Sequence, residues 1–303
     1  MSRRGWVLFA LMSVIWGIPY LMIKIAVEGV SAPVLVFART AVGAAILLPL
    51  GLRASGFGVL RRHWKPLVLF AVIEMMIPWV LLTDAERHLS SSMAGLLIAA
   101  VPIIAVIVGK LAGDREPLGA LRLTGLLVGF GGVALLAAPH LSGGGVVPMI
   151  EMFVVALGYA TAPLLAARKL KDVPSLPMTA VCLAMAAIVY TPPAILTWPE
   201  EMPSARVLWA IGGLAVVCTA LAFLVFFELI REVGPARATV FTYVNPAVAV
   251  AAGVLFLAEP LTPAILAAFA LILGGSVLAT MRGSGRRPAT AAGPPAPVDR
   301  ESA

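Results

Sequence analysis

Apolar stretches of about 20 residues, the length at which a helix crosses a bilayer, alternate with short polar stretches along most of the chain. Ten of them are expected as helices, at about 6–26, 33–52, 65–83, 93–112, 120–138, 147–167, 176–197, 207–229, 237–257 and 262–281. The gaps hold turn-forming residues, and Thr262-Pro263 is typical of the start of a helix. The pattern predicts an all-α integral membrane protein with ten transmembrane helices.

Basic side chains gather in alternate loops. Of the 22 Lys and Arg residues, 18 lie in the terminal segments and in the loops that share their side of the membrane. The opposite loops hold Arg87 and Arg206, while Lys24 and Arg39 fall within the spans. Because cytoplasmic loops carry an excess of Lys and Arg, we expect a multi-pass protein of the cell membrane with both termini in the cytoplasm.

The composition supports the membrane class and narrows the partners. Of the 303 residues, 61% are hydrophobic and 12% are charged, whereas a soluble domain is about a quarter charged. The net charge of +7 follows from the loop asymmetry, so it does not indicate binding to nucleic acid. Cys182 and Cys218 lie in apolar stretches and offer neither a disulfide framework nor a metal site. We therefore expect a lipid bilayer and a small-molecule substrate as partners, and no cofactor.

The two halves of the chain repeat each other. Pro102 and Pro246 are 144 residues apart, as are Arg87 and Arg231. Two short motifs recur at a spacing of 143 residues. Glu116-Pro117-Leu118 matches Glu259-Pro260-Leu261, and Gly131-Gly132 matches Gly274-Gly275. Each half has five spans, an odd number, so the second copy enters the membrane in the opposite sense. Inverted repeats of this kind are typical of secondary transporters, which bind substrate near the bilayer midplane between the halves.

The repeat divides the chain into four parts. Residues 1–5 are expected as a cytoplasmic N-terminus, 6–138 and 147–281 as the two five-helix repeats, and 282–303 as a disordered cytoplasmic tail. The tail is rich in Pro, Ala, Gly and Arg and has too little apolar surface to fold.

Several of these motifs resemble those of the EamA family of the drug/metabolite transporter superfamily. The resemblance rests on the repeat, on Trp16-Gly17, on the run from Arg231 to Ala238, on Tyr243-x-Asn-Pro246 and on Glu259-Pro-Leu-Thr262. It covers about residues 6–281. It implies ten helices in two inverted five-helix halves and the export or exchange of small metabolites, such as amino acids, purines, sugars or drugs.

Two charged residues deep in the spans are candidates for function, because charge inside a bilayer costs about 2.5–3.5 kcal/mol or more. Glu74 lies about nine residues, or roughly 13 Å, into the third span. It is our candidate for proton coupling or substrate binding, and the alternative is a protonated structural acid. Arg39 is expected to contact a substrate carboxylate, to pair with an acid such as Glu28 or Glu74, or to extend to the interface. Lys24, nearer its helix end, is expected to extend to the interface.

Aromatic and polar residues within the spans complete the predicted site. Trp16 and Tyr20 are four residues apart and are expected to share one helix face. The candidate cavity-lining residues are Trp16, Tyr20, Arg39, Glu74, Trp79, Tyr159, Thr242, Tyr243 and Asn245. The candidate helix breaks, which free backbone carbonyls toward a cavity, are Pro78, Pro102 and Pro246.

Charged residues at the span ends are either gates or solvated loop charges. On the outer side these are Asp84, Glu86, Arg87 and His88, and on the inner side Glu228, Arg231 and Glu232. Glu116 and Glu259 are expected as structural residues of the repeat. Gly125, Gly129 and the two Gly-Gly pairs favour close helix packing, and they leave a homodimer open.

Two other classes remain as alternatives to a secondary transporter. An integral membrane enzyme would need a catalytic constellation, but the three histidines lie in separate loops without metal-ligand spacing. A non-transporting scaffold would have no use for Glu74 and Arg39 in the bilayer. No phosphate-binding loop motif occurs, so the sequence does not support ATP-driven pumping by this chain. We therefore expect a transporter rather than an enzyme.

Overall fold

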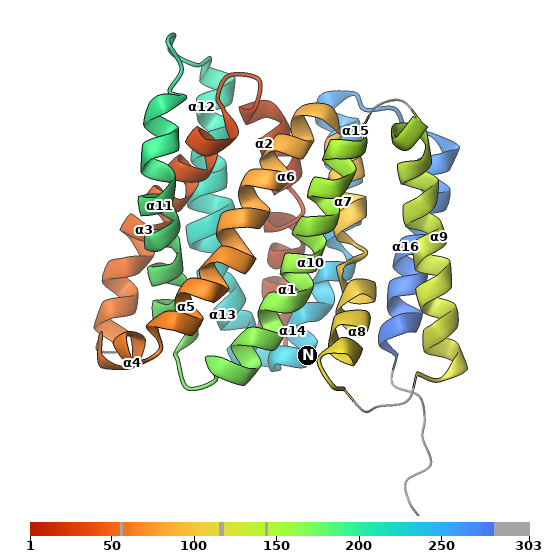
Figure 1. Ribbon diagram of the computed structural model, residues 1–303, viewed down its shortest axis with the longest axis horizontal. Helices are drawn as coiled ribbons and strands as arrows, with labels where there is room; N and C mark the ends of the chain where they lie inside the picture. The colour runs from red at the N-terminus through yellow and green to blue at the C-terminus, as the bar shows by residue number, and fades with distance from the viewer. Residues whose placement is uncertain (55–56, 115–117, 143–144, 282–303) are drawn as a thin grey trace, which may run out of the picture.

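The computed structural model describes residues 1–54, 57–114, 118–142 and 145–281. The expected tail, 282–303, lies outside the described residues, as do Glu116 and its neighbours Arg115 and Pro117. The described residues form helices that run roughly side by side between two opposite faces, and they contain no strand (Figure 1).

The first half builds five spans. They consist of α1 (Arg3–Ile15) with α2 (Pro19–Ala26); α3 (Ala32–Ala54); α5 (Trp64–Ala71), the π-helical η1 (Val72–Met76) and α6 (Ile77–His88); α7 (Ser91–Ile98) with α8 (Val101–Leu111); and α9 (Ala120–Ser142). A short helix, α4 (Phe57–Arg62), lies between the second and third spans.

The second half repeats this order. Its spans are α10 (Val146–Lys169); α11 (Ser175–Leu196); α12 (Ala205–Gly212), the π-helical η2 (Gly213–Leu221) and α13 (Ala222–Val233); α14 (Pro235–Ala238), the 3₁₀-helical η3 (Thr239–Tyr243) and α15 (Asn245–Leu257); and α16 (Pro263–Thr280). Nine of these spans in the described residues are long and apolar enough to cross a membrane, and α15 by itself is shorter. With α14 and η3 in front of α15, the count agrees with the ten expected helices.

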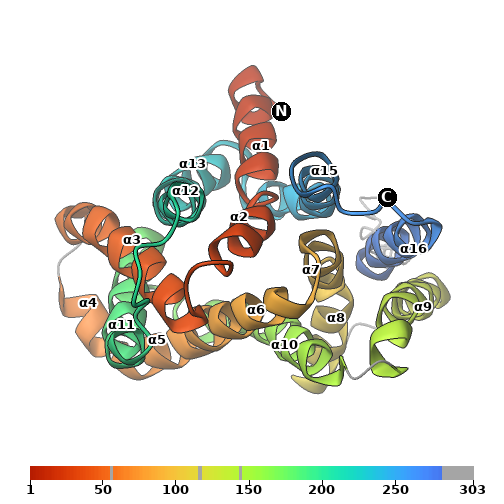
Figure 2. The same ribbon diagram turned by 90° about the horizontal axis from the view of Figure 1, so that it is seen from above.

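Corresponding helices of the two halves pack against each other. The most extensive contacts are those of α3 with α11 and of α9 with α16, which form opposite ends of the molecule (Figure 2). The cross-contacts follow the same symmetry, because the first span packs on the eighth through α1 and α13, and the sixth on the third through α10 and α6. The start of α1 and the end of α16 lie at one face, which we call the terminal face (Figure 1). The other we call the opposite face.

The interruptions of the third and fourth spans recur in the eighth and ninth. The fourth span breaks at Ala99-Ala100 before Pro102, and the ninth breaks before Pro246, 144 residues later. The third and eighth spans each contain a π-helical segment, η1 and η2, at matching positions. Proline lacks an N–H and a π-helix shifts the backbone pairing, so both leave carbonyls for other partners. Thus Tyr190 of α11 donates its hydroxyl to the carbonyl of Met76 in η1 at 2.8 Å.

Small residues allow α9 and α16 to approach closely. A methyl group added at Gly125 or at Gly275 would collide with the backbone of the facing helix. Gly129 and Gly132 lie at the same interface. Gly131 and Gly274 instead face open space, so only one glycine of each Gly-Gly pair serves the packing predicted from the sequence.

Candidate substrate site

Arg39 lies between the two halves of the molecule and contacts both. Its guanidinium carbon is 3.7 Å from the centre of the Trp79 ring, and its Nε donates to Thr219 Oγ1 at 2.7 Å. Arg39 and Trp79 belong to the first half, while Thr219 belongs to the second. All three side chains are buried. A desolvated cation over an aromatic face gains about 2 kcal/mol, which offsets part of the cost of burying the charge.

The two π-helical segments help to position these partners. Thr219 lies in η2 and donates its own hydroxyl hydrogen to the carbonyl of Leu214 at 2.8 Å, five residues earlier. Its oxygen is therefore oriented to accept from Arg39. Trp79 follows η1 and Pro78, at the start of α6. The two Nη nitrogens of Arg39 have no partner among the described residues, and neither is fully enclosed.

Two tyrosines from different halves lie in the electrostatic environment of Arg39. Tyr20 of α2 is buried, and its ring lies close to Gly95 of α7. Tyr159 of α10 is partly buried. Both phenols lie within electrostatic range of Arg39, so the structure brings together four of the predicted residues: Tyr20, Arg39, Trp79 and Tyr159. We call these four residues the Arg39 cluster.

Glu74 lies on the Tyr159 side of this cluster, in η1. Its carboxylate interacts electrostatically with Tyr159 and with Cys182 of α11. No ion pair joins it to Arg39, although the structure describes both side chains. Glu28, the other acid considered for Arg39, lies 3.9 Å from Arg206 instead. The predicted pairing of Arg39 with an acid is therefore wrong, and Thr219 and Trp79 take the place of that acid.

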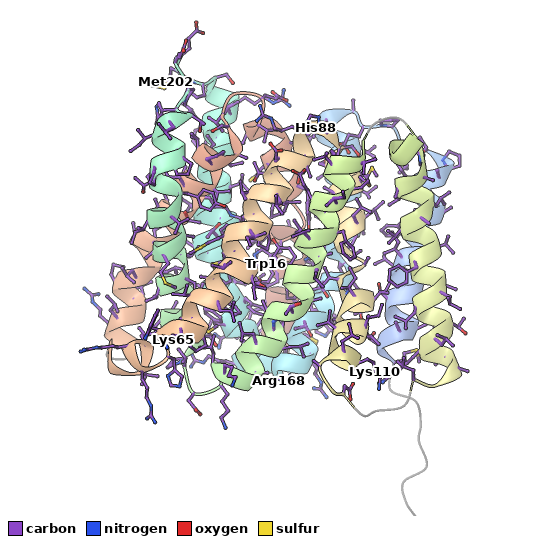
Figure 3. The ribbon with its side chains drawn as sticks, viewed as in Figure 1. Trp16, Lys65, His88, Lys110, Arg168 and Met202 are labelled. Carbon is purple, nitrogen blue, oxygen red and sulfur yellow. The ribbon has the colours of Figure 1, made fainter. Side chains whose placement is uncertain are left out.

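Trp16 belongs to a different part of the molecule. The first span is interrupted between α1 and α2, at residues 16–18, so Trp16 and Tyr20 do not share a face of one continuous helix. The Trp16 ring, seen near mid-height in Figure 3, packs against Phe223, Phe226 and Phe241 with ring centroids 5.0–5.6 Å apart. The prediction of a shared face fails because Pro19 starts a new helix.

The polar residues before Pro246 serve the helix break. Thr242 donates to the carbonyl of Thr239 at 2.8 Å, and Tyr243 shares a 2.7 Å hydrogen bond with Thr280 of α16. The side-chain amide of Asn245 faces two carbonyl oxygens, of Phe241 at 3.1 Å and of Ser13 at 3.2 Å, so its nitrogen is assigned to that side. These contacts attach the ninth span to α1 and α16. None of the contacts of Thr242, Tyr243 and Asn245 is with a residue of the Arg39 cluster.

At the terminal face, charged side chains join α1 to α13. Arg4 pairs with Glu228 at 2.9 Å, and Ser2 hydrogen-bonds to Glu232. The Glu228–Arg231 pair within α13 is 2.9 Å. Its counterpart 144 residues earlier, Asp84–Arg87, is 3.8 Å and ends α6 at the opposite face. The predicted end charges thus recur in both halves.

At the opposite face, the ammonium group of Lys24 binds the end of α6. This group donates to the carbonyls of Glu86 at 2.6 Å and Leu89 at 2.8 Å. Lys24 also lines a pocket of about 650 Å³ whose other polar lining residues are Glu28, His88, Ser90, Arg206 and Glu259. A cation at a helix C-terminus is favourable because the last carbonyls carry partial negative charge.

Glu86 was grouped with the surface charges by its sequence position, but its side chain is fully buried. Nothing in the sequence distinguishes it from Asp84, which is 43% exposed. The partner of Glu259 was likewise not predictable. Its carboxylate accepts hydrogen bonds from the backbone and hydroxyl groups of Ser91 and Ser92, so it caps α7 from the other half of the chain.

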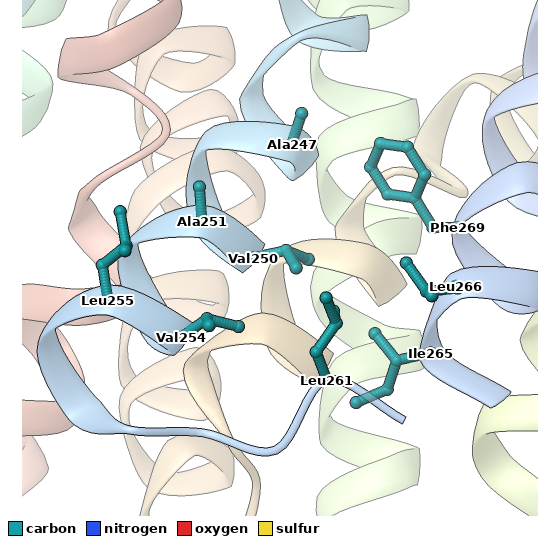
Figure 4. Close-up of a pocket in the computed structure, with 9 residues that line it drawn as sticks. All are labelled: Ala247, Val250, Ala251, Val254, Leu255, Leu261, Ile265, Leu266 and Phe269. Atoms are coloured by element: carbon teal, nitrogen blue, oxygen red, sulfur yellow. The ribbon is translucent and has the colours of Figure 1, made fainter. Parts of the chain in front are cut away.

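A second pocket, of about 380 Å³, lies between α15 and α16 (Figure 4). Every residue that lines it is apolar, Phe269 being the largest. It therefore offers no group that would orient a polar substrate. Within the described part of the chain, no three His, Cys, Asp or Glu residues are arranged to hold a metal ion.

Ten helices in two inverted halves, with a buried arginine between them, define a membrane protein of the inverted-repeat transporter class. The chain matches the model of the EamA-like transporter family twice, over residues 3–138 and 147–281, and it belongs to that family. The relatives described next are named as transporters, which supports the assignment of this protein as a membrane transporter.

Three relatives cover most of the chain. It is 29% identical to the inner membrane transporter YedA of Escherichia coli, over 90% of this chain and 89% of YedA. It is 25% identical to the transporter YvbV of Bacillus subtilis, over 95% of each chain. It is 26% identical to a protein of Streptantibioticus cattleyicolor named as a probable terminal-alkyne amino-acid exporter, over 95% of this chain and 96% of the relative.

A solved crystal structure shares the fold, with a TM-score of 0.66 at 23% identity. The structural match covers 92% of this chain and 98% of the chain in the crystal structure.

Proposed function

We propose that this protein is a secondary active transporter that exports or exchanges small metabolites, amino acids or related compounds and drugs, by alternating access. The terminal face is the cytoplasmic one, as the excess of basic residues in its loops indicates. Figure 3 places Lys65, Lys110 and Arg168 at this face and His88 at the other. Rocking of the inverted halves would expose the Arg39 cluster to each side in turn.

Arg39 carries the proposal. The cation is buried at the contact between the halves, one side is covered by Trp79, and both Nη nitrogens remain unpaired. A guanidinium fork binds a carboxylate through two parallel hydrogen bonds, and it is weakly hydrated enough to be buried. Tyr20, Trp79 and Tyr159 supply apolar surface with polar edges beside it. This arrangement suits a small amphipathic molecule with a carboxylate, which includes amino acids.

Counterflow in proteoliposomes tests the proposal. Vesicles are loaded with a mixture of unlabelled L-amino acids, and uptake of each radiolabelled amino acid is measured. Loss of a charge-assisted hydrogen-bonded contact costs about 1.5–3 kcal/mol, so Arg39→Gln should lower uptake at least about tenfold. Arg62→Gln, which removes an exposed arginine of α4, is the matched control and should keep wild-type uptake. Equal uptake by the two variants would refute the role of Arg39, and no uptake of any amino acid by the wild type would refute this substrate class.

Glu74 is the proposed proton-coupling residue. It lies about 15 Å along its span from the terminal face, close to Tyr159, where a proton could be exchanged with the substrate site. In the same vesicles, Glu74→Gln should abolish uptake driven by a pH gradient while counterflow persists. Unchanged response to the gradient in a folded Glu74→Gln protein would remove this role.

A further inference from the structure

Glu86 is an acid for which the transport site described above has no use. It lies in the last turns of α6, its side chain has no exposed surface, and neither carboxylate oxygen has a hydrogen-bond partner. Buried polar groups in proteins are almost always hydrogen-bonded, and an unpaired buried charge costs several kcal/mol. A carboxyl group in this position is tolerated as the neutral acid, and it is poorly placed for a purely structural function.

The pocket at the opposite face lies next to this acid. Lys24 lines the pocket and at the same time donates to the backbone carbonyl of Glu86. His88 and Leu89, the residues that follow Glu86 closely in the chain, also line the pocket. The carboxyl group of Glu86 also interacts electrostatically with Lys24 and Glu259, which both line the pocket, so the acid and the pocket share these two neighbours.

The groups that face Glu86 come from several elements. From α2, Lys24 attracts a negative charge on Glu86, and Tyr20 lies one turn below Lys24. From the loop after α15, Glu259 repels such a charge, and Glu259 is itself held by Ser91 and Ser92 of α7.

The neighbouring helices also carry charged groups. On α10, Glu151 interacts with Asp84 and has one buried carboxylate oxygen without a hydrogen-bond partner, and on α3, Arg39 is bound to Thr219 and Trp79. The ammonium of Lys24 is therefore the group best placed to balance an ionised Glu86.

We propose that Glu86 is a second proton-binding residue of the transport cycle, loaded and unloaded through the pocket at the opposite face. In the present conformation Glu86 holds its proton while Lys24 binds the carbonyls of Glu86 and Leu89. When this face opens, the carboxyl group gives its proton to a water molecule of the pocket, and Lys24 moves from the carbonyls to the new carboxylate. Release of the proton and opening of this face are thereby linked. The inference rests on the proposed transport function and adds to it a site distinct from Glu74.

Infrared difference spectroscopy tests the protonation without any substrate. Difference spectra of the protein in lipid vesicles between about pH 6 and about pH 10 contain a carboxylic-acid C=O band for each acid that loses its proton in that range; ordinary exposed acids give none because they are already ionised at about pH 6. Glu86→Gln should remove one such band, and Glu86→Asp should shift it. Glu201→Gln, at an exposed acid in the loop before α12, should leave the spectrum unchanged. A wild-type spectrum from both Glu86 variants would overturn the proposal, whether or not amino acids prove to be the substrates.

Transport measurements test the link to the cycle. Glu86→Gln should retain counterflow but respond at least about tenfold less than the wild type to a pH gradient. Lys24→Met removes the counter-ion and should slow gradient-driven uptake while the Glu86 band persists. A full response to the gradient in Glu86→Gln would contradict a coupling function. Failure of the wild type to transport amino acids would count against the proposed function, and the infrared result would still decide the protonation of Glu86.

Discussion

Substitution of Glu259 by alanine should destabilise the protein strongly, although the residue lies in a loop. The first turn of α7 has four backbone N–H groups without helical partners. Glu259 accepts from Ser91 N at 2.7 Å and from Ser92 N at 3.0 Å. Met93 N donates to Ser90 Oγ, and Ala94 N makes the first helical hydrogen bond, to the Ser90 carbonyl. Glu259 thus completes the cap.

The expected cost follows from what its removal leaves behind. Ser91 and Ser92 are buried, so both N–H groups lose their acceptor, and water entering from the pocket that Glu259 lines would move the cost toward the lower end of the range. Each unsatisfied buried N–H costs about 1–3 kcal/mol, so the two together cost about 2–6 kcal/mol. At about 2–4 °C per kcal/mol, a central value of about 4 kcal/mol lowers the melting temperature by roughly 8–16 °C. Glu259→Gln keeps one acceptor oxygen and should fall about halfway.

Thermal unfolding of the detergent-solubilised protein, followed by intrinsic fluorescence, measures this shift. Glu28→Ala is the control, because Glu28 pairs with Arg206 in an exposed ion pair and such pairs contribute about 0–1 kcal/mol. A shift for Glu259→Ala no larger than that for Glu28→Ala would refute the assignment of Glu259 as the cap of α7.

Two further predictions concern backbone geometry and use the same unfolding assay. Gly275→Ala should lower the melting temperature by several degrees, because the added methyl group would collide with the backbone of α9. Gly274 faces open space, so Gly274→Ala should be neutral or slightly stabilising. Equal effects of the two substitutions on the melting temperature would disprove the packing of α16 on α9. Ala258→Gly should stabilise the protein by about 1 kcal/mol, since Ala258 has a left-handed backbone with φ of 53°, a strained conformation for a residue with a side chain. Ala251→Gly in the exposed face of α15 should destabilise it by a similar amount, and a loss of stability in Ala258→Gly would contradict the reasoning.

Arg39 and Glu86 show which properties of a charged residue can be predicted from its position in a span and which depend on tertiary contacts. Both are charged residues in or beside apolar segments. The sequence identified Arg39 as a candidate because its depth follows from counting residues along a helix. Its partners, Thr219 and Trp79, were not predictable, since Thr219 comes from a span 180 residues away. Glu86 was missed because counting places it at a helix end, and only the packing of other helices on α6 encloses it.

The sequence by itself determined the number of spans and the inverted repeat, and its loop charges are the basis for the predicted sidedness. These features depend on hydropathy, loop charge and recurrent Pro and Gly positions, which are local properties that a bilayer converts directly into topology. Tertiary structure decided the rest: the break that separates Trp16 from Tyr20, the use of Tyr243 and Asn245 to hold the ninth span, and the cap that Glu259 places on α7. Each depends on which side chains meet across helices far apart in the chain. Because most spans are apolar on every side, the sequence pattern does not reveal which face is turned inward.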